Sequence, residues 1–208
     1  MRQNLKCAYL SKRAYGKDKF IIDKKYLIEN KKTDTQCYVF TEGKITYIAF
    51  RGTELKLKDI FTDLWAFKKD IPFKNTKGIR VHGGFLKAYM SVRDDILSKV
   101  IELGNHRIIA TGHSLGGALA TLCSVDLEKN SIAHPCDIIL YTYGSPKVGN
   151  RKFRKSFGKR IVYHNRYVNR FDIVPTVPVF ASHTGRKIKL KPKIRHDINN
   201  YIYNVIAQ

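Results

Sequence analysis

Apolar residues follow two spacings along this chain, one typical of strands and the other typical of helices. Short β-branched and aromatic runs bounded by turn residues predict strands, whereas apolar residues at steps of three and four predict helices. The expected strands cover residues 37–41, 45–50, 78–82, 107–111, 138–143, 161–168 and 188–190. The expected helices cover residues 3–15, 85–103, 115–129, a short segment around 153–157, and 198–206.

Strands that alternate with helices predict an α/β fold, with a mostly parallel central sheet and helices on both of its faces. The runs at 37–41 and 45–50 surround Glu42-Gly43-Lys44, a hairpin sequence, and add antiparallel strands at one edge. No repeat or linker interrupts the 208 residues, so we expect one domain over 1–208. In such a sheet, catalytic groups gather at the carboxyl ends of the strands.

The segment Gly112-His113-Ser114-Leu115-Gly116 lies between the strand at 107–111 and the helix that follows it. Its glycines relieve crowding around a strained turn, which lifts a serine hydroxyl from the top of the sheet. The helix that begins behind the serine presents unpaired N–H groups to an oxygen that becomes negative during reaction. The pattern therefore predicts a nucleophile elbow, with Ser114 as the nucleophile.

A serine nucleophile needs a histidine base and a carboxylate that orients it, and on this type of sheet the chain order is serine, acid, histidine. Asp172 fits best, because it follows the strand at 161–168 at its carboxyl end. A turn or helix cap is the alternative role for Asp172. The other acids after Ser114 are less well placed. Asp126 and Glu128 fall in the helix after the elbow, and Asp137 precedes a strand, at its wrong end. Asp197 is the last acid in the chain.

Four histidines follow the serine and compete for the role of base. His196 is preferred, because it lies on a loop after all the expected strands, immediately before the last helix. His183, at a hairpin tip, remains the alternative. Positions inside a strand and before a proline favour structural roles for the other two, His164 and His134.

An oxyanion hole would complete such a site with two backbone donors. The N–H of Leu115 is the first expected donor, because it directly follows the nucleophile. The loop Arg51-Gly52-Thr53, after the strand at 45–50, supplies the second donor. Thr53 can donate through both its amide and its hydroxyl group.

Charge is the unusual bulk property, since 39 Lys and Arg oppose 17 Asp and Glu and give a net charge of +22. Such a surface is either simply solvated or attracts polyanions, of which an anionic membrane and nucleic acid are the candidates.

No 18-residue apolar run or signal peptide is visible in the sequence, and the cysteines lack metal-ligand spacing. We therefore expect free, partly buried thiols and a cytoplasmic or otherwise intracellular location. The cysteines are Cys7, Cys37, Cys123 and Cys136.

Several segments, in order, make the chain similar to the class 3 (fungal-type) lipases of the α/β-hydrolase superfamily. The matching segments are 50–53, 81–85, 111–118, 143–150, 169–175, 180–185, and His196 with Tyr201. The resemblance implies Ser114, Asp172 and His196 as the catalytic triad, and Thr53 and Leu115 as the oxyanion hole. It also implies a mobile lid helix at 54–65, for which a fixed packing helix is the alternative. Lys147 departs from the arginine usual in this family.

The resemblance implies a serine hydrolase that cleaves carboxylic esters of lipids through an acyl-enzyme, of the acylglycerol lipase type. It requires no metal and no organic cofactor, and its expected partner is a lipid ester substrate. The net charge of +22 keeps a phospholipase A1 acting on anionic phospholipids as an alternative, with peripheral contact to anionic membranes. A non-catalytic module that binds nucleic acid or anionic surfaces is the least favoured hypothesis.

Overall fold

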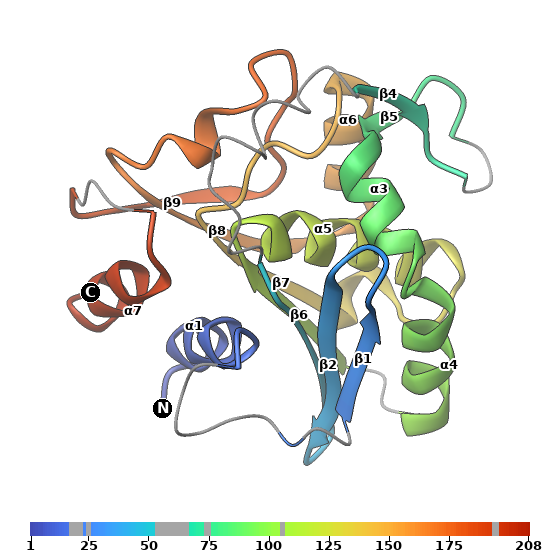
Figure 1. Ribbon diagram of the computed structural model, residues 1–208, viewed down its shortest axis with the longest axis horizontal. Helices are drawn as coiled ribbons and strands as arrows, with labels where there is room; N and C mark the ends of the chain where they lie inside the picture. Colours follow the sequence, from blue (N-terminus) through green and yellow to red (C-terminus); the bar gives the residue numbers. More distant parts are fainter. Residues whose placement is uncertain (17–22, 24–25, 53–66, 73–75, 105–106, 193–195) are drawn as a thin grey trace.

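Seven strands form one sheet in a computed structural model that describes residues 1–16, 23, 26–52, 67–72, 76–104, 107–192 and 196–208. The strand order is β1-β2-β3-β6-β7-β8-β9 (Figure 1). Neighbouring strands are parallel from β3 to β9, and β1 and β2 are antiparallel at one edge. The strands are β1 (Leu27–Asn30), β2 (Thr35–Glu42), β3 (Ile45–Phe50), β6 (Arg107–His113), β7 (Ile138–Tyr143), β8 (Tyr163–Asn169) and β9 (Arg186–Leu190).

Helices cover both faces of this sheet, as Figure 1 shows. One face carries α1 (Gln3–Arg13) and α7 (Ile198–Ile206), and the guanidinium of Arg2 donates to the carbonyl oxygen of Val205 at 3.0 Å. The other face carries α3 (Gly83–Met90), α4 (Arg93–Leu103), α5 (Leu115–Lys129) and α6 (Arg151–Arg160). Each face encloses its own cluster of buried apolar side chains, so the predicted two-faced α/β fold is confirmed.

A second, two-stranded sheet lies above one end of the main sheet and consists of β4 (Phe67–Asp70) and β5 (Arg80–His82). The backbone N–H of His82 donates to Val148 at 3.0 Å, and Val81 forms an isolated bridge with Gly149. These bonds attach β5 to the chain that follows β7, on the side of the carboxyl ends of the parallel strands.

Two helix predictions are wrong in their bounds. The expected helix over 85–103 is interrupted between α3 and α4, where Val92 has the non-helical angles φ −127° and ψ 0°. The hydroxyl of Ser91 donates to the carbonyl of Ala88 at 2.8 Å and lies 2.6 Å from the Thr33 hydroxyl, which ties the break to β1 and β2. The short helix expected around 153–157 extends from Arg151 to Arg160 as α6.

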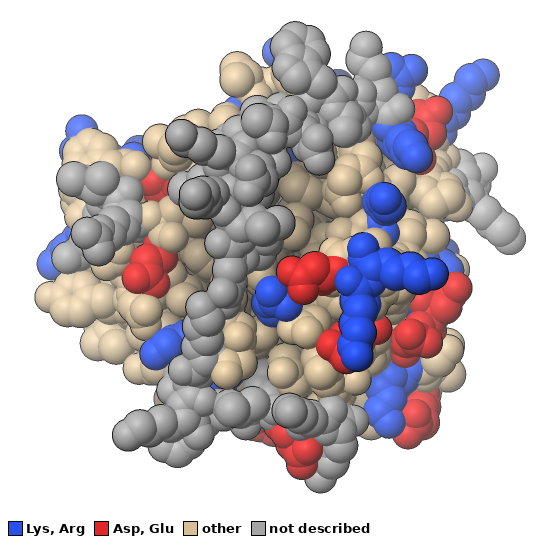
Figure 2. Space-filling view, in the orientation of Figure 1, with Lys and Arg blue, Asp and Glu red and all other residues tan. Residues whose placement is uncertain are grey.

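Positive charge spreads over several elements of the surface. Figure 2 shows Lys and Arg among Asp and Glu over α4, and further Lys and Arg at the corner where β4 and β5 lie in Figure 1. Among the described residues, no helix is both long enough and apolar enough to cross a membrane.

Candidate active site

Ser114 occupies a sharp turn between β6 and α5. Its backbone angles are φ 57° and ψ −129°, a strained combination for a residue other than glycine, and its N–H donates to the carbonyl of Tyr143 at 3.0 Å. A Cβ atom on Gly112 would lie 2.2 Å from the carbonyl carbon of Gly116. Only a residue without a side chain therefore lets the strand and the helix approach so closely, as the predicted nucleophile elbow requires.

The start of α5 also packs directly against the end of β3. A Cβ atom on Gly116 would lie 2.5 Å from the carbonyl oxygen of Phe50 and 3.0 Å from the carbonyl carbon of Arg51. Leu115 is the first residue of α5, so its N–H has no acceptor within the helix. The loop expected to donate the second oxyanion hydrogen bond therefore begins beside Leu115, although Thr53 itself lies outside the described residues.

Asp172 and His196 form a hydrogen-bonded pair. The Nδ1 atom of His196 lies 2.6 Å from Oδ2 of Asp172, and the other carboxylate oxygen accepts from the N–H of Val174 at 2.9 Å. Asp172 is buried, and the second ring nitrogen of His196, Nε2, is buried without a hydrogen bond to any residue that the structure describes. This arrangement leaves Nε2 as the atom that can take up a proton while Asp172 holds the opposite side of the ring.

Two observations place this pair next to the elbow. A Cβ atom on Gly144 would lie 2.8 Å from Cε1 of His196 and 2.9 Å from Oδ2 of Asp172, and Gly144 directly follows the residue that bonds Ser114. The ring of His113 stacks on that of His196, with centroids 4.5 Å apart and planes inclined by 24°. The fold therefore gathers all three residues of the predicted triad at the carboxyl ends of β6, β7 and β8.

Tyr201 is a polar neighbour of the site for which sequence reasoning found no role. Its hydroxyl donates to Oδ2 of Asp172 at 2.5 Å and accepts from the N–H of Asn169 at 3.4 Å. Burial raises the pKa of Tyr201, and the adjacent Asp172 carboxylate raises that pKa further, so the hydroxyl keeps its proton. Oδ2 of Asp172, which bonds His196, therefore also accepts a hydrogen bond from a residue of α7.

His113 is the other contributor that the sequence did not reveal. Burial lowers its pKa well below 6.5, and the neighbouring His196 lowers that pKa further. Its Nδ1 lies 2.9 Å from the hydroxyl of Tyr15, which follows α1. At neutral pH, His113 therefore presents an uncharged ring to His196 and does not repel a proton that His196 receives.

The competing histidines serve structural roles. The Nε2 atom of His183 lies 2.5 Å from the carbonyl oxygen of Pro175, and burial lowers the pKa of His183 to about 3. His164 bonds two threonine hydroxyls between β7 and the chain before β9, and His134 accepts from the N–H of Cys136. Among the described residues, none of these three histidines forms a hydrogen bond with Asp172.

The rejected acids are likewise occupied elsewhere. Asp126 is buried in α5 and pairs with Arg93 at 2.6 Å, Glu128 pairs with Arg160 at 2.7 Å, and Asp197 caps α7. Asp137 lies in the short 3₁₀ helix before β7, at the amino end of that strand. In the described residues, no cluster of His, Cys, Asp and Glu has the arrangement of a metal site.

Access to Ser114 differs from expectation. The residue is only 2% exposed, whereas the sequence predicted a hydroxyl that projects from the top of the sheet. The segment 54–65, for which a lid was one of two hypotheses, lies outside the described residues.

A serine on a strand–turn–helix elbow, with the acid and the histidine after later strands of a parallel sheet, defines an α/β hydrolase. Comparison with known proteins narrows the class. The family model for lipase (class 3) matches residues 47–182, so the chain belongs to the class 3 lipase family.

Individual relatives agree with this family. A lipase from Rhizopus niveus is 36% identical over 153 residues, which are 70% of this chain and 38% of the relative. Phospholipase A1-Igamma2 from Arabidopsis thaliana is 33% identical over 160 residues, covering 63% of this chain and 30% of the relative. The chain therefore spans less than half the length of these curated relatives.

Solved structures show the same fold. A triacylglycerol lipase whose catalytic centre is described as a serine protease triad superposes with a TM-score of 0.75 and 28% sequence identity. The superposition covers 89% of this chain and 78% of that structure.

Proposed function

We propose that the protein hydrolyses carboxylic esters of lipids through a serine acyl-enzyme, as an acylglycerol lipase. The observation that carries this proposal is the 2.6 Å hydrogen bond between Asp172 and His196, which lies beside the positive-φ elbow at Ser114. Membership of the class 3 lipase family supports the same chemistry. One sheet extends from β1 to β9, so we treat residues 1–208 as one catalytic domain.

The reaction uses the triad twice. The Ser114 hydroxyl attacks the ester carbonyl while Nε2 of His196 takes its proton, and Asp172 stabilises the imidazolium that forms. The histidine then gives this proton to the leaving alcohol as the carbon–oxygen bond of the ester breaks. Water attacks the acyl-enzyme, His196 accepts the proton of that water and returns it to Ser114, and the fatty acid leaves.

Charge on the carbonyl oxygen develops at the start of α5. In the proposal, the N–H of Leu115 donates to this oxygen, and Thr53 donates through its amide and hydroxyl. Such a donor contributes about 3–4 kcal/mol to transition-state stabilisation in serine hydrolases.

The test compares Ser114→Ala with Ser98→Ala, which removes an exposed serine hydroxyl on α4. With a soluble short-chain ester and an emulsified triacylglycerol as substrates, we expect Ser114→Ala to lower kcat on the order of ten-thousandfold or more. Ser98→Ala should retain the wild-type rate. Hydrolysis by Ser114→Ala at an undiminished rate would overturn the proposed mechanism.

Phospholipase A1 activity on anionic phospholipids is the second candidate, favoured by the net charge of +22. Similarity to a plant protein named as a phospholipase A1 adds to it. Rates on neutral and anionic vesicles across a salt series separate the two candidates. A preference for anionic vesicles that weakens with salt supports the phospholipase, and a salt-insensitive preference for neutral glycerides excludes it.

We also propose an intracellular, reducing compartment for the protein. All four cysteines are free thiols, and three of them are buried within the two apolar clusters. Disulfides are the common alternative in exported proteins, so unpaired thiols favour this location.

A further inference from the structure

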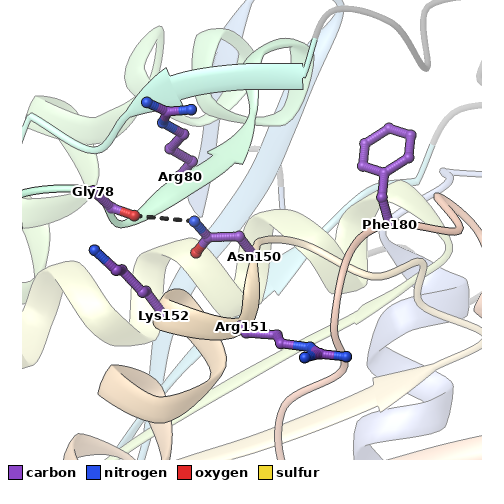
Figure 3. A pocket seen from close by; sticks show the side chains of 6 residues that line it. All are labelled: Gly78, Arg80, Asn150, Arg151, Lys152 and Phe180. Atoms are coloured by element: carbon purple, nitrogen blue, oxygen red, sulfur yellow. Dashed lines mark hydrogen bonds between the residues drawn. The ribbon is translucent and has the colours of Figure 1, made fainter.

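A hollow with a cationic lining lies beside the second sheet, away from the triad. Its volume is about 450 Å³, and Figure 3 shows the side chains that line it. The lining comes from the turn before β5, β5 itself, the start of α6 and the loop after β8: Gly78, Arg80, Asn150, Arg151, Lys152 and Phe180. The four segments belong to distant parts of the sequence, so the hollow exists only in the folded chain.

Hydrogen bonds fix the walls of this hollow. The Asn150 side-chain amide donates to the carbonyl of Gly78 at 3.0 Å, the contact drawn in Figure 3, and the Asn150 backbone N–H donates to Arg80 at 2.9 Å. On the other side, the N–H of Ser182 donates to the carbonyl of Gly149 at 2.8 Å. These bonds hold the two cationic walls and the Phe180 loop in a fixed relation.

Positive charge at the hollow is largely uncompensated. Arg151 and Lys152 make no ion pair with any residue that the structure describes. Arg80 has one carboxylate nearby, Asp70 at 3.6 Å, but the two side chains are 48% and 65% exposed and such a pair contributes little. Three cations with a single paired carboxylate among the described residues therefore favour an anionic occupant, and guanidinium groups match the oxygens of phosphate in particular.

Exposed apolar side chains adjoin the cations. The loop after β8 exposes Phe171, Ile173, Val179 and Phe180 by 52% to 81% of their surface. Phe180 lines the hollow, while Asp172 of the triad lies in the same loop. Cations beside exposed apolar groups are typical of surfaces that contact anionic membranes, where the cations meet headgroups and the apolar groups enter the acyl boundary.

We infer that this hollow binds the headgroup phosphate of an anionic phospholipid in a membrane. Arg80 and Lys152 contact the phosphate oxygens, and Phe180 enters the apolar layer beside them. Arg151, which Figure 3 shows directed away from Lys152, adds positive charge at the rim of the hollow. The hollow and the triad both lie at the carboxyl ends of the parallel strands, so a bound headgroup orients this edge of the protein toward the membrane. The inference deepens the proposed function, because it names an anionic lipid surface for the same site.

Vesicle binding of the full chain tests the inference, with Ser114→Ala in every protein so that no lipid is consumed. Affinity is measured by sedimentation with phosphatidylcholine vesicles, with and without phosphatidylglycerol. Each cation near an anionic surface contributes about 1 kcal/mol, so Arg151→Gln with Lys152→Gln should weaken binding to the anionic vesicles roughly thirtyfold. Binding to pure phosphatidylcholine should be weak for all variants.

The matched control is Lys44→Gln with Arg107→Gln, which removes the same two charges from exposed positions at the amino ends of β3 and β6. This control should change affinity by less than about threefold, because its charges lie at the opposite edge of the sheet. Equal losses for the two double variants would show a general charge effect and overturn the inference. Thermal unfolding of each variant establishes that the loss does not arise from unfolding.

Inorganic phosphate, titrated by calorimetry at constant ionic strength, separates the lipid source from the free ion. We expect only weak binding, reduced further by Arg151→Gln with Lys152→Gln. Tight phosphate binding together with unaltered vesicle affinity in the double variant would assign the hollow to the free ion and overturn the membrane assignment. Because binding is measured without turnover, its failure is distinct from failure of the proposed hydrolysis.

Discussion

Replacing Tyr201 with Phe removes one hydroxyl from the site and keeps the ring that packs in the core. In the folded protein this hydroxyl donates to Oδ2 of Asp172 at 2.5 Å, where His196 also bonds at 2.6 Å. Both Tyr201 and Asp172 are buried, so water cannot replace the lost donor without rearrangement. A hydrogen bond to a charged group contributes about 1.5–3 kcal/mol, and we expect Tyr201→Phe to lower the free energy of unfolding by about 2 kcal/mol.

Catalysis should respond as well, because the Asp172 oxygen that orients His196 loses one of its two side-chain donors. If about 1.4 kcal/mol of this interaction acts on the orientation of the imidazole, kcat falls roughly tenfold. KM for a soluble ester should stay within about twofold, since Tyr201 is 0% exposed and does not meet substrate.

The assay combines urea unfolding with steady-state hydrolysis of the soluble ester. Tyr163→Phe is the control, because it removes the hydroxyl of a tyrosine on β8 whose surface is 50% exposed. A Tyr201→Phe enzyme with the stability and kcat of this control would refute the reasoning that Tyr201 positions Asp172. A rise in KM with unchanged kcat would equally contradict it.

Three further predictions concern stability and thiol chemistry. Burial lowers the pKa of both His164 and His183 from 6.5 to about 3, so the unfolded chain binds more protons than the folded chain between these pH values. The free energy of unfolding, measured with urea, should therefore fall as the pH drops below 6.5. In His164→Asn this fall should be less steep by about 1.4 kcal/mol per pH unit. Gly112→Ala should abolish ester hydrolysis, because the added Cβ would lie 2.2 Å from a carbonyl carbon. Gly158→Ala is the matched control: it lies inside α6 with no atom within 4 Å of the added Cβ, so it should raise the free energy of unfolding by up to about 1 kcal/mol. A thiol reagent should label Cys136 alone in the native protein, because the other cysteines are buried, and labelling of a second thiol before unfolding would contradict the packing.

Much of the sheet could be predicted because apolar spacing records which face of an element is buried. The strands at 45–50 and 138–143 and the helix at 198–206 match β3, β7 and α7. The break between α3 and α4 could not be predicted, since the apolar positions continue at helical steps across it. At the break, the hydroxyl of Ser91 contacts that of Thr33, a residue that only the folded chain brings close to it. The short strands β1 and β4 were not predicted either.

In the proposed site, chain order and strand ends select three residues that the fold brings to one end of the sheet: Ser114, Asp172 and His196. The roles of Tyr201 and His113 could not be selected in this way, because they depend on how α7 and the chain after α1 dock on the sheet. For the contact of Tyr201 with Asp172, the signal in the sequence was the position of Tyr201, five residues after His196. Burial of the serine also depends on packing, which a local motif does not encode.

The central claim is that Ser114 is the nucleophile, and the most direct measurement locates the bond it forms. The protein is treated with an organophosphonate ester and digested, and the modified peptide is identified by mass spectrometry. We predict one adduct, on the Ser114 hydroxyl, absent in Ser114→Ala and strongly slowed in a His196→Gln variant. An adduct on another residue, or undiminished labelling of Ser114→Ala, would contradict the account.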